Sequence, residues 1–192
     1  KSVGLGKKQK QRLTKKKLEG AKRGAKSRMM KRIRITDEIK KEAANEIKNI
    51  NDKELWLMGI MLYWAEGSKE KPGRPGTGVQ FSNSDPYMIK LFLKWLLDIC
   101  KISKEKIRFE IYIHENSINE LTIVKKYWAT ITNFEPTDFQ NIYFKKHKIK
   151  TNRKNINENY YGLLRIKVRE SSSLNRKISG WIEGILKNCG VV

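Results

Sequence analysis

The chain has 192 residues, of which 42 are Lys or Arg and 20 are Asp or Glu, so its formal net charge is +22. A polyanion is the natural ligand for such an excess, because each phosphate that a cation neutralises releases condensed counterions. The longest apolar run, Leu55–Ala65, is well short of the roughly 20 residues of a spanning helix. A membrane protein is therefore not expected, and nucleic acid is the leading ligand class.

The cysteines and histidines argue against a disulfide framework and against a zinc site. Cys100 and Cys189 are far apart in the sequence, and the only histidines are His114 and His147. This spacing matches no usual ligand motif, and so few cysteines are typical of a reducing compartment. The N-terminus is charged and lacks the apolar stretch of a signal peptide. An intracellular location, in the cytoplasm, nucleoid or an organelle, is expected.

Charge is concentrated at the start of the chain. Residues 1–50 carry 18 Lys or Arg against 5 Asp or Glu, a net charge of +13. This asymmetry predicts a basic helical arm over 1–50 and a globular domain over 51–192. Apolar residues recur at helical spacing up to a break near Arg34, and Thr36 looks like the cap of a second helix over 36–49. The DNA contacts predicted on this arm, for which a solvated face is the alternative, are Lys15, Lys16, Lys17 and Arg32.

A very apolar helix is predicted next. Asn51 and Glu54 resemble a capping box, which starts a helix over about 52–67. The run Leu55–Ala65 is apolar on every side, so this helix is expected to be buried all round. It ends in Glu66. An acid at a helix C-terminus is disfavoured by the helix dipole unless a cation lies nearby.

The remaining elements predict an α+β fold. After a Pro- and Gly-rich loop at 70–78, the expected order is strand 79–82, helix 86–100, strand 107–114, helix 118–132, strands 139–147 and 163–169, and helix 173–187. This order favours one four-stranded sheet with helices packed on one face. The opposite face, which is rich in Arg, Lys, Asn and Tyr, is left for a ligand.

Two short segments resemble a known family. Leu62–Ser68, at the end of the apolar helix, resembles the signature of the LAGLIDADG homing endonucleases. Phe81–Pro86 resembles the strand-to-helix junction of their intein and intron relatives. The resemblance covers about residues 52–188. It implies a LAGLIDADG-like domain and a metal-dependent, site-specific endonuclease of double-stranded DNA, of the kind that mobile genetic elements encode.

The resemblance also implies an active site. In that family, two signature helices pack together and each ends in an acid that binds divalent metal; Glu66 is the matching residue, which implies a Mg²⁺ ligand. Asn83 matches a polar residue near the reacting water, although a turn residue ahead of Asp85 is the alternative interpretation. A basic residue completes such sites. Lys145, Arg165 and Lys167 are all candidates, and Lys167 is taken as the catalytic one.

A single signature in the chain implies a homodimer through helix 52–67, which would bind a roughly palindromic site. Ile178–Gly184 superficially resembles a second signature, but too few residues follow it to build a second sheet. Met61 departs from the family pattern, which has a small residue there. Close packing between the two helices is therefore expected to be looser, or to shift to Gly59 and Ala65.

Two groups of DNA contacts are expected in the domain. Residues on the polar sheet face are candidates for reading base edges, namely Arg108, Tyr112, Asn141, Tyr143, Lys145, Arg165, Lys167 and Arg169. Residues of the following basic segment are candidates for gripping phosphates, namely Lys146, Lys148, Lys150, Arg153 and Lys154. A solvated face is again the alternative for the first group.

Other functions stay open at this point. A sequence-specific regulator that kept the fold and lost cleavage is compatible with the departure at Met61, whereas Glu66 favours the enzyme. An RNA-binding protein is compatible with the basic arm. Aromatic residues suited to stacking on single-stranded bases are sparse on the polar faces, which argues mildly against RNA.

Overall fold

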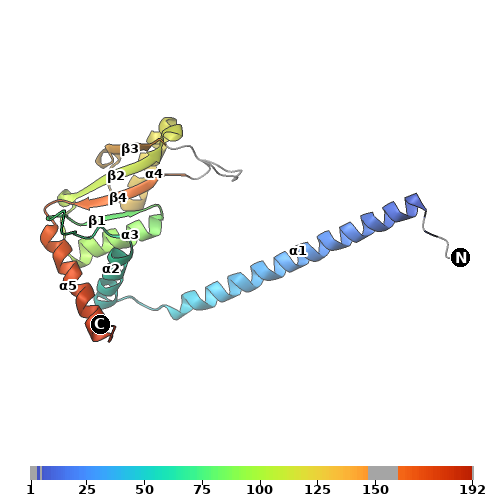
Figure 1. Cartoon of the computed structure of the whole chain (residues 1–192), viewed down its shortest axis with the longest axis horizontal. Helices are drawn as coiled ribbons and strands as arrows, with labels where there is room; N and C mark the ends of the chain where they lie inside the picture. The colour runs from blue at the N-terminus through green and yellow to red at the C-terminus, as the bar shows by residue number, and fades with distance from the viewer. Residues whose placement is uncertain (1–3, 5, 147–159, 192) are drawn as a thin grey trace. The chain divides into compact units, whose positions relative to one another are not determined.

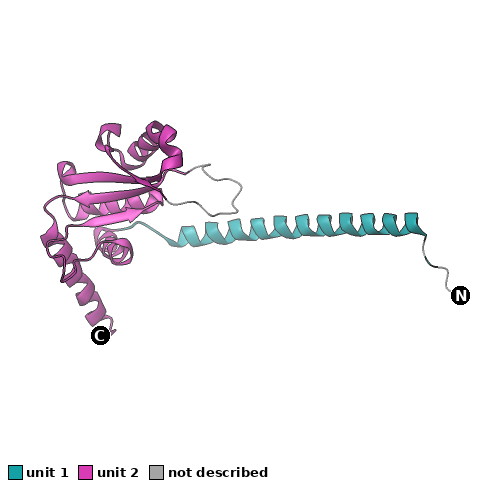
Figure 2. Cartoon of the chain, turned by 45° about the horizontal axis from the view of Figure 1, so that its top comes forward, with its two compact units in different colours: residues 1–50 teal, residues 51–192 magenta. Residues whose placement is uncertain are grey.

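The structure, a computed structural model, describes residues 4, 6–146 and 160–191. The chain divides into two compact units, 1–50 and 51–192 (Figures 1 and 2). The first unit consists mainly of helix α1 (Lys7–Glu46), every residue of which is described and none of which is buried. No helix in the described part of the chain is long and apolar enough to cross a membrane.

The predicted break in the arm is wrong, because α1 runs through Arg34 and Thr36 without interruption. The sequence between Ala25 and Glu46 contains neither Gly nor Pro and is rich in strong helix formers. The β-branched residues around position 34 each cost only a few tenths of a kcal/mol in a helix. A possible N-cap at Thr36 is therefore too weak a signal to start a new helix.

The second unit is an α+β domain, as predicted. Its helices and strands are α2 (Asp52–Glu66), β1 (Gln80–Asn83), α3 (Pro86–Lys94), β2 (Ile107–His114), α4 (Leu121–Thr132), β3 (Asn141–Lys145), β4 (Leu163–Val168) and α5 (Ser172–Asn188). A π-helical turn, Trp95–Ile99, continues α3, and a 3₁₀ segment, Glu115–Glu120, precedes α4. The two predicted helices 86–100 and 118–132 are therefore regular over only part of their length.

The four strands form one mixed sheet in the order β1-β4-β2-β3 (Figure 1). The pair β2–β3 is parallel, and the other two pairs are antiparallel. Phe81, Ile166 and Phe109 lie side by side across three strands, and all three are buried. They belong to one core with apolar residues of α2, α3, α4 and α5, so this face of the sheet is the covered one. Alternation along each strand turns the polar side chains to the other face.

Burial of α2 on all sides is wrong. One side of the helix packs into the domain through Leu55, Gly59, Ile60 and Tyr63. A second stripe of large apolar side chains is exposed, with relative exposures of 37% for Leu57, 36% for Met58 and 48% for Met61. The domain covers only one side of this helix, so an apolar composition all round leaves an apolar stripe in solvent.

Gly59 lies on the inner side of α2, against the indole ring of Trp95. A Cβ atom at this position would overlap that ring. The Trp95 Nε1 group also donates a hydrogen bond to the Trp56 carbonyl at 3.2 Å, which fixes the ring beside the helix. Gly59 therefore allows close packing within the chain. The expected shift of close packing between two copies to Gly59 is therefore wrong, because Gly59 faces Trp95 of its own chain, whereas Ala65 is exposed.

We expect Gly59→Ala to lower the free energy of unfolding by about 2 kcal/mol or more, because the indole ring of Trp95 must move out of a packed core. Urea denaturation followed by tryptophan fluorescence measures this change. Gly180→Ala in α5 is the matched control, because a Cβ there meets nothing within 4 Å. It should stabilise the domain by up to about 1 kcal/mol through helix propensity. Equal effects of the two substitutions would contradict the assignment of Gly59.

Candidate nucleic-acid interface and metal site

Strand register brings polar residues from all four strands into one row. Ser82 pairs with Arg165, Arg165 with Glu110, and Glu110 with Asn141. The neighbouring row contains Gln80, Lys167 and Arg108. We call this surface the polar face, made up of Gln80, Ser82, Arg108, Glu110, Tyr112, Asn141, Tyr143, Arg165 and Lys167. Most of the expected base-reading residues lie on it.

Glu110 lies at the centre of the polar face and is buried. Its carboxylate accepts from Lys167 Nζ at 3.0 Å, Arg165 Nη1 at 3.3 Å and the Tyr112 hydroxyl at 2.9 Å. Burial alone raises the pKa of Glu110. The hydrogen bonds from Lys167 and Tyr112, together with the charges of Lys167 and Arg165, outweigh burial and hold the pKa below its ordinary value. Glu110 is therefore an ionised acid between two cations.

Aromatic rings hold one of these cations in place. The Arg165 guanidinium lies over the Tyr112 ring, 4.5 Å from its centroid, and Arg165 Nε donates to Ser82 Oγ at 2.9 Å. The Tyr112 ring stacks on Tyr143 with centroids 4.8 Å apart. Burial, and then the bond to Glu110, raise the pKa of Tyr112. Arg165 of β4 is thus oriented by contacts from two neighbouring strands, β1 and β2.

Other predicted contacts of the sheet lie around this centre. Arg108 Nη1 donates to the carbonyls of Glu105 and Ile107, both at 2.8 Å, and the Arg108 side chain is exposed. Asn141 Nδ2 donates to the Phe109 carbonyl at 3.4 Å. Lys145 pairs in register with His114 at the end of β3, while the exposed residues Lys146 and Arg169 lie just beyond the ends of β3 and β4. Four residues of the predicted phosphate-gripping segment lie outside the described residues, namely Lys148, Lys150, Arg153 and Lys154. The four contacts predicted on the arm are all exposed, namely Lys15, Lys16, Lys17 and Arg32.

Glu66 is the last residue of α2 and is exposed. Gly67 forms a β-bridge with Phe81, and Ser68 N donates to the Gln80 carbonyl at 2.9 Å. The backbone that follows Glu66 is therefore held at the β1 edge of the sheet. Within the described residues, no group of three or more His, Cys, Asp and Glu could hold a metal ion. Glu66 offers carboxylate oxygens, the donor type that Mg²⁺ prefers, but belongs to no such group among the described residues.

Asn83 is placed apart from Lys167. It pairs in register with the buried residue Leu164, on the side of the sheet that the helices cover. Its Oδ1 accepts from the Asp85 backbone N–H at 2.8 Å, and Asp85 in turn caps α3 by accepting from Tyr87 and Met88. These contacts are those of a turn residue, the alternative interpretation of Asn83.

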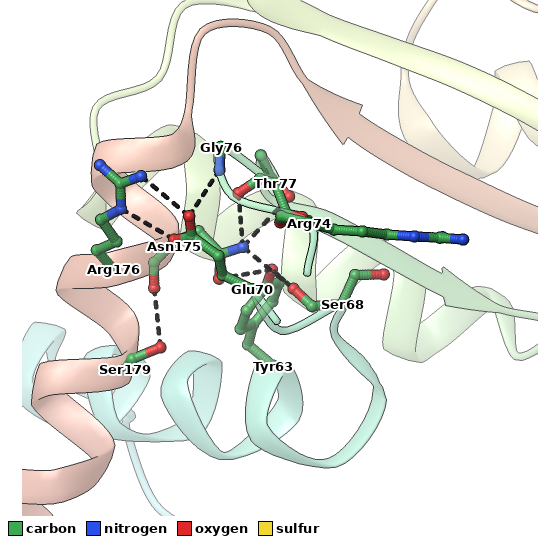
Figure 3. Close-up of polar contacts among 10 residues, drawn as sticks. Tyr63, Ser68, Glu70, Arg74, Gly76, Thr77, Asn175, Arg176 and Ser179 are labelled. Carbon is green, nitrogen blue, oxygen red and sulfur yellow. Dashed lines mark hydrogen bonds and ion pairs between the residues drawn. The ribbon is translucent and has the colours of Figure 1, made fainter. Parts of the chain in front are cut away.

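A polar cluster fastens the segment that follows Glu66 (Figure 3). Asn175 of α5 is fully buried, and its Nδ2 donates to the carbonyls of Thr77 at 2.8 Å and Ser68 at 3.2 Å. The Tyr63 hydroxyl of α2 donates to the Ser68 carbonyl and lies 3.2 Å from Asn175 Oδ1. Burial raises the pKa of Tyr63 to about 12, so this donor stays protonated. The cluster therefore joins the end of α2, both ends of the loop 68–78 and α5.

The tip of that loop is held by an ion pair. The Glu70 carboxylate accepts from Arg176 Nε and Nη2, both at 2.9 Å, and from the Gly76 backbone N–H at 2.6 Å (Figure 3). The bonds from Arg176, followed by the bond from Gly76, lower the pKa of Glu70 from 4.5 to about 2. This bidentate pair fixes the loop against α5.

Comparisons of the chain with protein-family models, with curated proteins and with solved structures found no match. The likeness of Leu62–Ser68 and Phe81–Pro86 to the LAGLIDADG signature and junction therefore rests on those residues alone. Two important side chains were missed at the level of sequence. Glu110 alternates with Arg108 and Tyr112 along β2, a pattern that places it on the polar face. Asn175 gave no such signal.

The Glu70–Arg176 pair makes stability depend on pH. Because folding lowers the pKa of Glu70, its contribution is present above about pH 4.5 and is lost as the pH falls towards 2. We expect Glu70→Gln to be less stable than the wild type at pH 7, and the gap to shrink between pH 5 and 3. Urea unfolding at several pH values measures this difference in the free energy of unfolding. Glu183→Gln, on an exposed position of α5, is the control; a Glu70→Gln gap that does not change with pH would contradict this role.

Proposed function

We propose that this chain is a metal-dependent, site-specific endonuclease of double-stranded DNA that acts as a homodimer, in the manner of the LAGLIDADG homing endonucleases. One observation carries the proposal. An apolar stripe on α2 is left uncovered, and the same helix ends in an exposed carboxylate, Glu66. A second copy seated on that stripe would bury it and bring a second α2 terminus to the same place.

The stripe suits a second copy of the chain. Leu57, Met58 and Met61 are flexible or branched apolar side chains on one side of the helix, and Ala65 continues the stripe towards Glu66. Exposed apolar contact surface costs free energy that a self-complementary contact recovers. A twofold contact repeats each residue on both partners. It would therefore bring a second Glu66 carboxylate beside the first, whereas Glu66 belongs to no group of three or more ligating residues in the described part of its own chain.

Mg²⁺ fits this arrangement by the chemistry of the donors. One or two carboxylates, waters and substrate phosphates are the usual Mg²⁺ ligands, and paired Glu66 side chains would provide the carboxylates. When bound, the ion would activate a water molecule and stabilise the leaving oxygen. The helix dipole disfavours an acid at the end of α2, and a cation offsets both charges. Lys167 is proposed as the basic residue of the site.

The polar face and the arm are the proposed DNA contacts. Arg165 and Lys167 point outwards with side-chain exposures of 32% and 43%, and the described cations of the arm are exposed throughout. A duplex is the polyanion with base edges and two rows of phosphates that such a surface can use. We expect the arm to provide non-specific affinity and the face to provide discrimination.

A non-catalytic DNA-binding regulator is the second candidate, and specific contacts favour it. Asn83 is engaged in the turn ahead of α3, on the covered side of the sheet. Lys167 is held by Glu110 at 3.0 Å. Two of the three proposed catalytic residues thus have structural partners. The two candidate functions differ chemically at Glu66, which the nuclease needs as a metal ligand and the regulator does not.

The decisive experiment is a cleavage-site selection from a randomised duplex library with Mg²⁺. We expect the wild type to cut enriched sites, and Glu66→Gln to lose cutting by about a hundredfold or more while it still binds, because it removes a metal ligand from the reacting phosphate. Glu115→Gln, at another exposed acid, is the control. Enrichment of bound sites without any cutting would favour the regulator, and undiminished cutting by Glu66→Gln would refute the proposed site.

The dimer has its own test. We expect Met61→Glu to convert the protein to a monomer in analytical ultracentrifugation, because it places a charge in the middle of the proposed apolar contact. Ile123→Glu makes the same chemical change on α4, at a side chain with 60% exposure, and should leave the dimer intact. A wild type that sediments as a monomer, both alone and with a selected duplex, would contradict the homodimer.

A further inference from the structure

An acidic residue such as Glu110 is unusual on a surface that is proposed to bind DNA. Among the described residues it is the one buried carboxylate, and it lies at the centre of the polar face rather than at its edge. A negative charge repels phosphate, so affinity for a polyanion does not explain it. Burial of a charge is costly unless the charge is paired and hydrogen-bonded. Glu110 meets that condition through two cations and a hydroxyl.

The contacts of Glu110 determine where its two cations can reach. Lys167 bonds one carboxylate oxygen and Arg165 bonds the other. Arg165 is fixed further by the ring of Tyr112 and by Ser82 Oγ. Its Nε and Nη1 are therefore engaged, whereas Nη2 has no hydrogen-bond partner among the described residues. The two hydrogens of Arg165 Nη2 can therefore be donated to a ligand, at a position that the other contacts of Arg165 fix.

The net charge around Glu110 also differs from that of a typical phosphate-binding site. Two cations and one anion leave this centre with a net charge of +1. A phosphate arriving there would meet the carboxylate as well as the cations, and would compete with it for them. A base edge carries neutral acceptors, such as the O6 and N7 atoms of guanine, and meets no such repulsion. The arrangement therefore favours base edges over phosphates.

We propose that Glu110 is a specificity-determining positioning residue, which holds Arg165 so that its remaining donors meet base-edge acceptors and which keeps phosphates off that guanidinium. This inference rests on the proposed binding of double-stranded DNA, but not on cleavage. Loss of Glu110 frees Arg165 to contact phosphates. Binding then becomes tighter to any sequence and less selective.

The test compares wild type, Glu110→Gln and Tyr112→Phe on a duplex recovered by selection with the wild-type chain and on a scrambled duplex of equal length. We expect Glu110→Gln to reduce the ratio of specific to non-specific affinity about tenfold or more. The slope of log affinity against log salt should steepen by about one, since one more phosphate is neutralised. Tyr112→Phe removes the hydroxyl that joins Glu110 to Arg165 without a change of charge, and should lower the ratio in the same direction.

Glu170→Gln is the control for charge. Glu170 pairs with Lys106 at 3.1 Å and is exposed, so this substitution removes one negative charge away from the centre of the face. It should leave the ratio unchanged. Thermal unfolding of each variant checks the fold, and Tyr112→Phe carries the test if Glu110→Gln does not fold.

The outcomes separate this inference from the proposed function. A wild type that selects a sequence, with a ratio unchanged in both Glu110→Gln and Tyr112→Phe, would overturn the role of Glu110 and leave DNA binding standing. Failure of the wild type to enrich any duplex sequence would overturn both. Sequence-selective binding without cleavage, together with a reduced ratio in the variants, would support the role of Glu110 and refute the nuclease alone.

Discussion

The side chain of Asn175 joins three segments of the domain that are far apart in the sequence. Its amide nitrogen donates hydrogen bonds to carbonyls at both ends of the loop 68–78, and its amide oxygen lies beside the Tyr63 hydroxyl of α2. Without this amide the Thr77 carbonyl would lose its hydrogen bond from Asn175, and the Ser68 carbonyl would keep the bond from the Tyr63 hydroxyl. Together with the backbone contacts of Gly67 and Ser68 with β1, this amide fixes the end of α2 and the approach to β1. The Glu70–Arg176 pair at the loop tip adds a second, exposed attachment to α5.

The sheet separates two kinds of chemistry by a single residue of register. Phe81 and Ile166 face the core, while their neighbours Ser82 and Arg165 face the polar surface. A shift of one residue would exchange the two sets, so the large apolar core also fixes the row that contains Glu110. The core thereby defines the proposed DNA-contacting surface, although it forms no part of that surface.

The uncovered stripe of α2 and the open polar face are different kinds of exposed surface. The first exposes Leu57, Met58 and Met61 and suits an apolar, self-complementary partner. The second carries paired charges that are already bonded within the chain and suits a ligand with hydrogen-bonding edges. Glu66 belongs to the same helix as the stripe, and the backbone that follows it is held at the β1 edge of the sheet that bears the face. The proposed nuclease requires both surfaces, whereas a DNA-binding regulator requires the polar face and can use the same dimer.

Composition and local pattern by themselves determined the net charge of +22, the α+β order, and the caps at Asn51 and Asp85, because each depends on residues that are neighbours in the sequence. Alternation also determined that Arg165 and Lys167 share one face of β4. Only the tertiary structure decided that Glu110 lies between them, that Gly59 meets Trp95 and that one side of α2 stays exposed. Those outcomes depend on which strand pairs with which and on how many layers cover a helix, and both are set by contacts between distant residues.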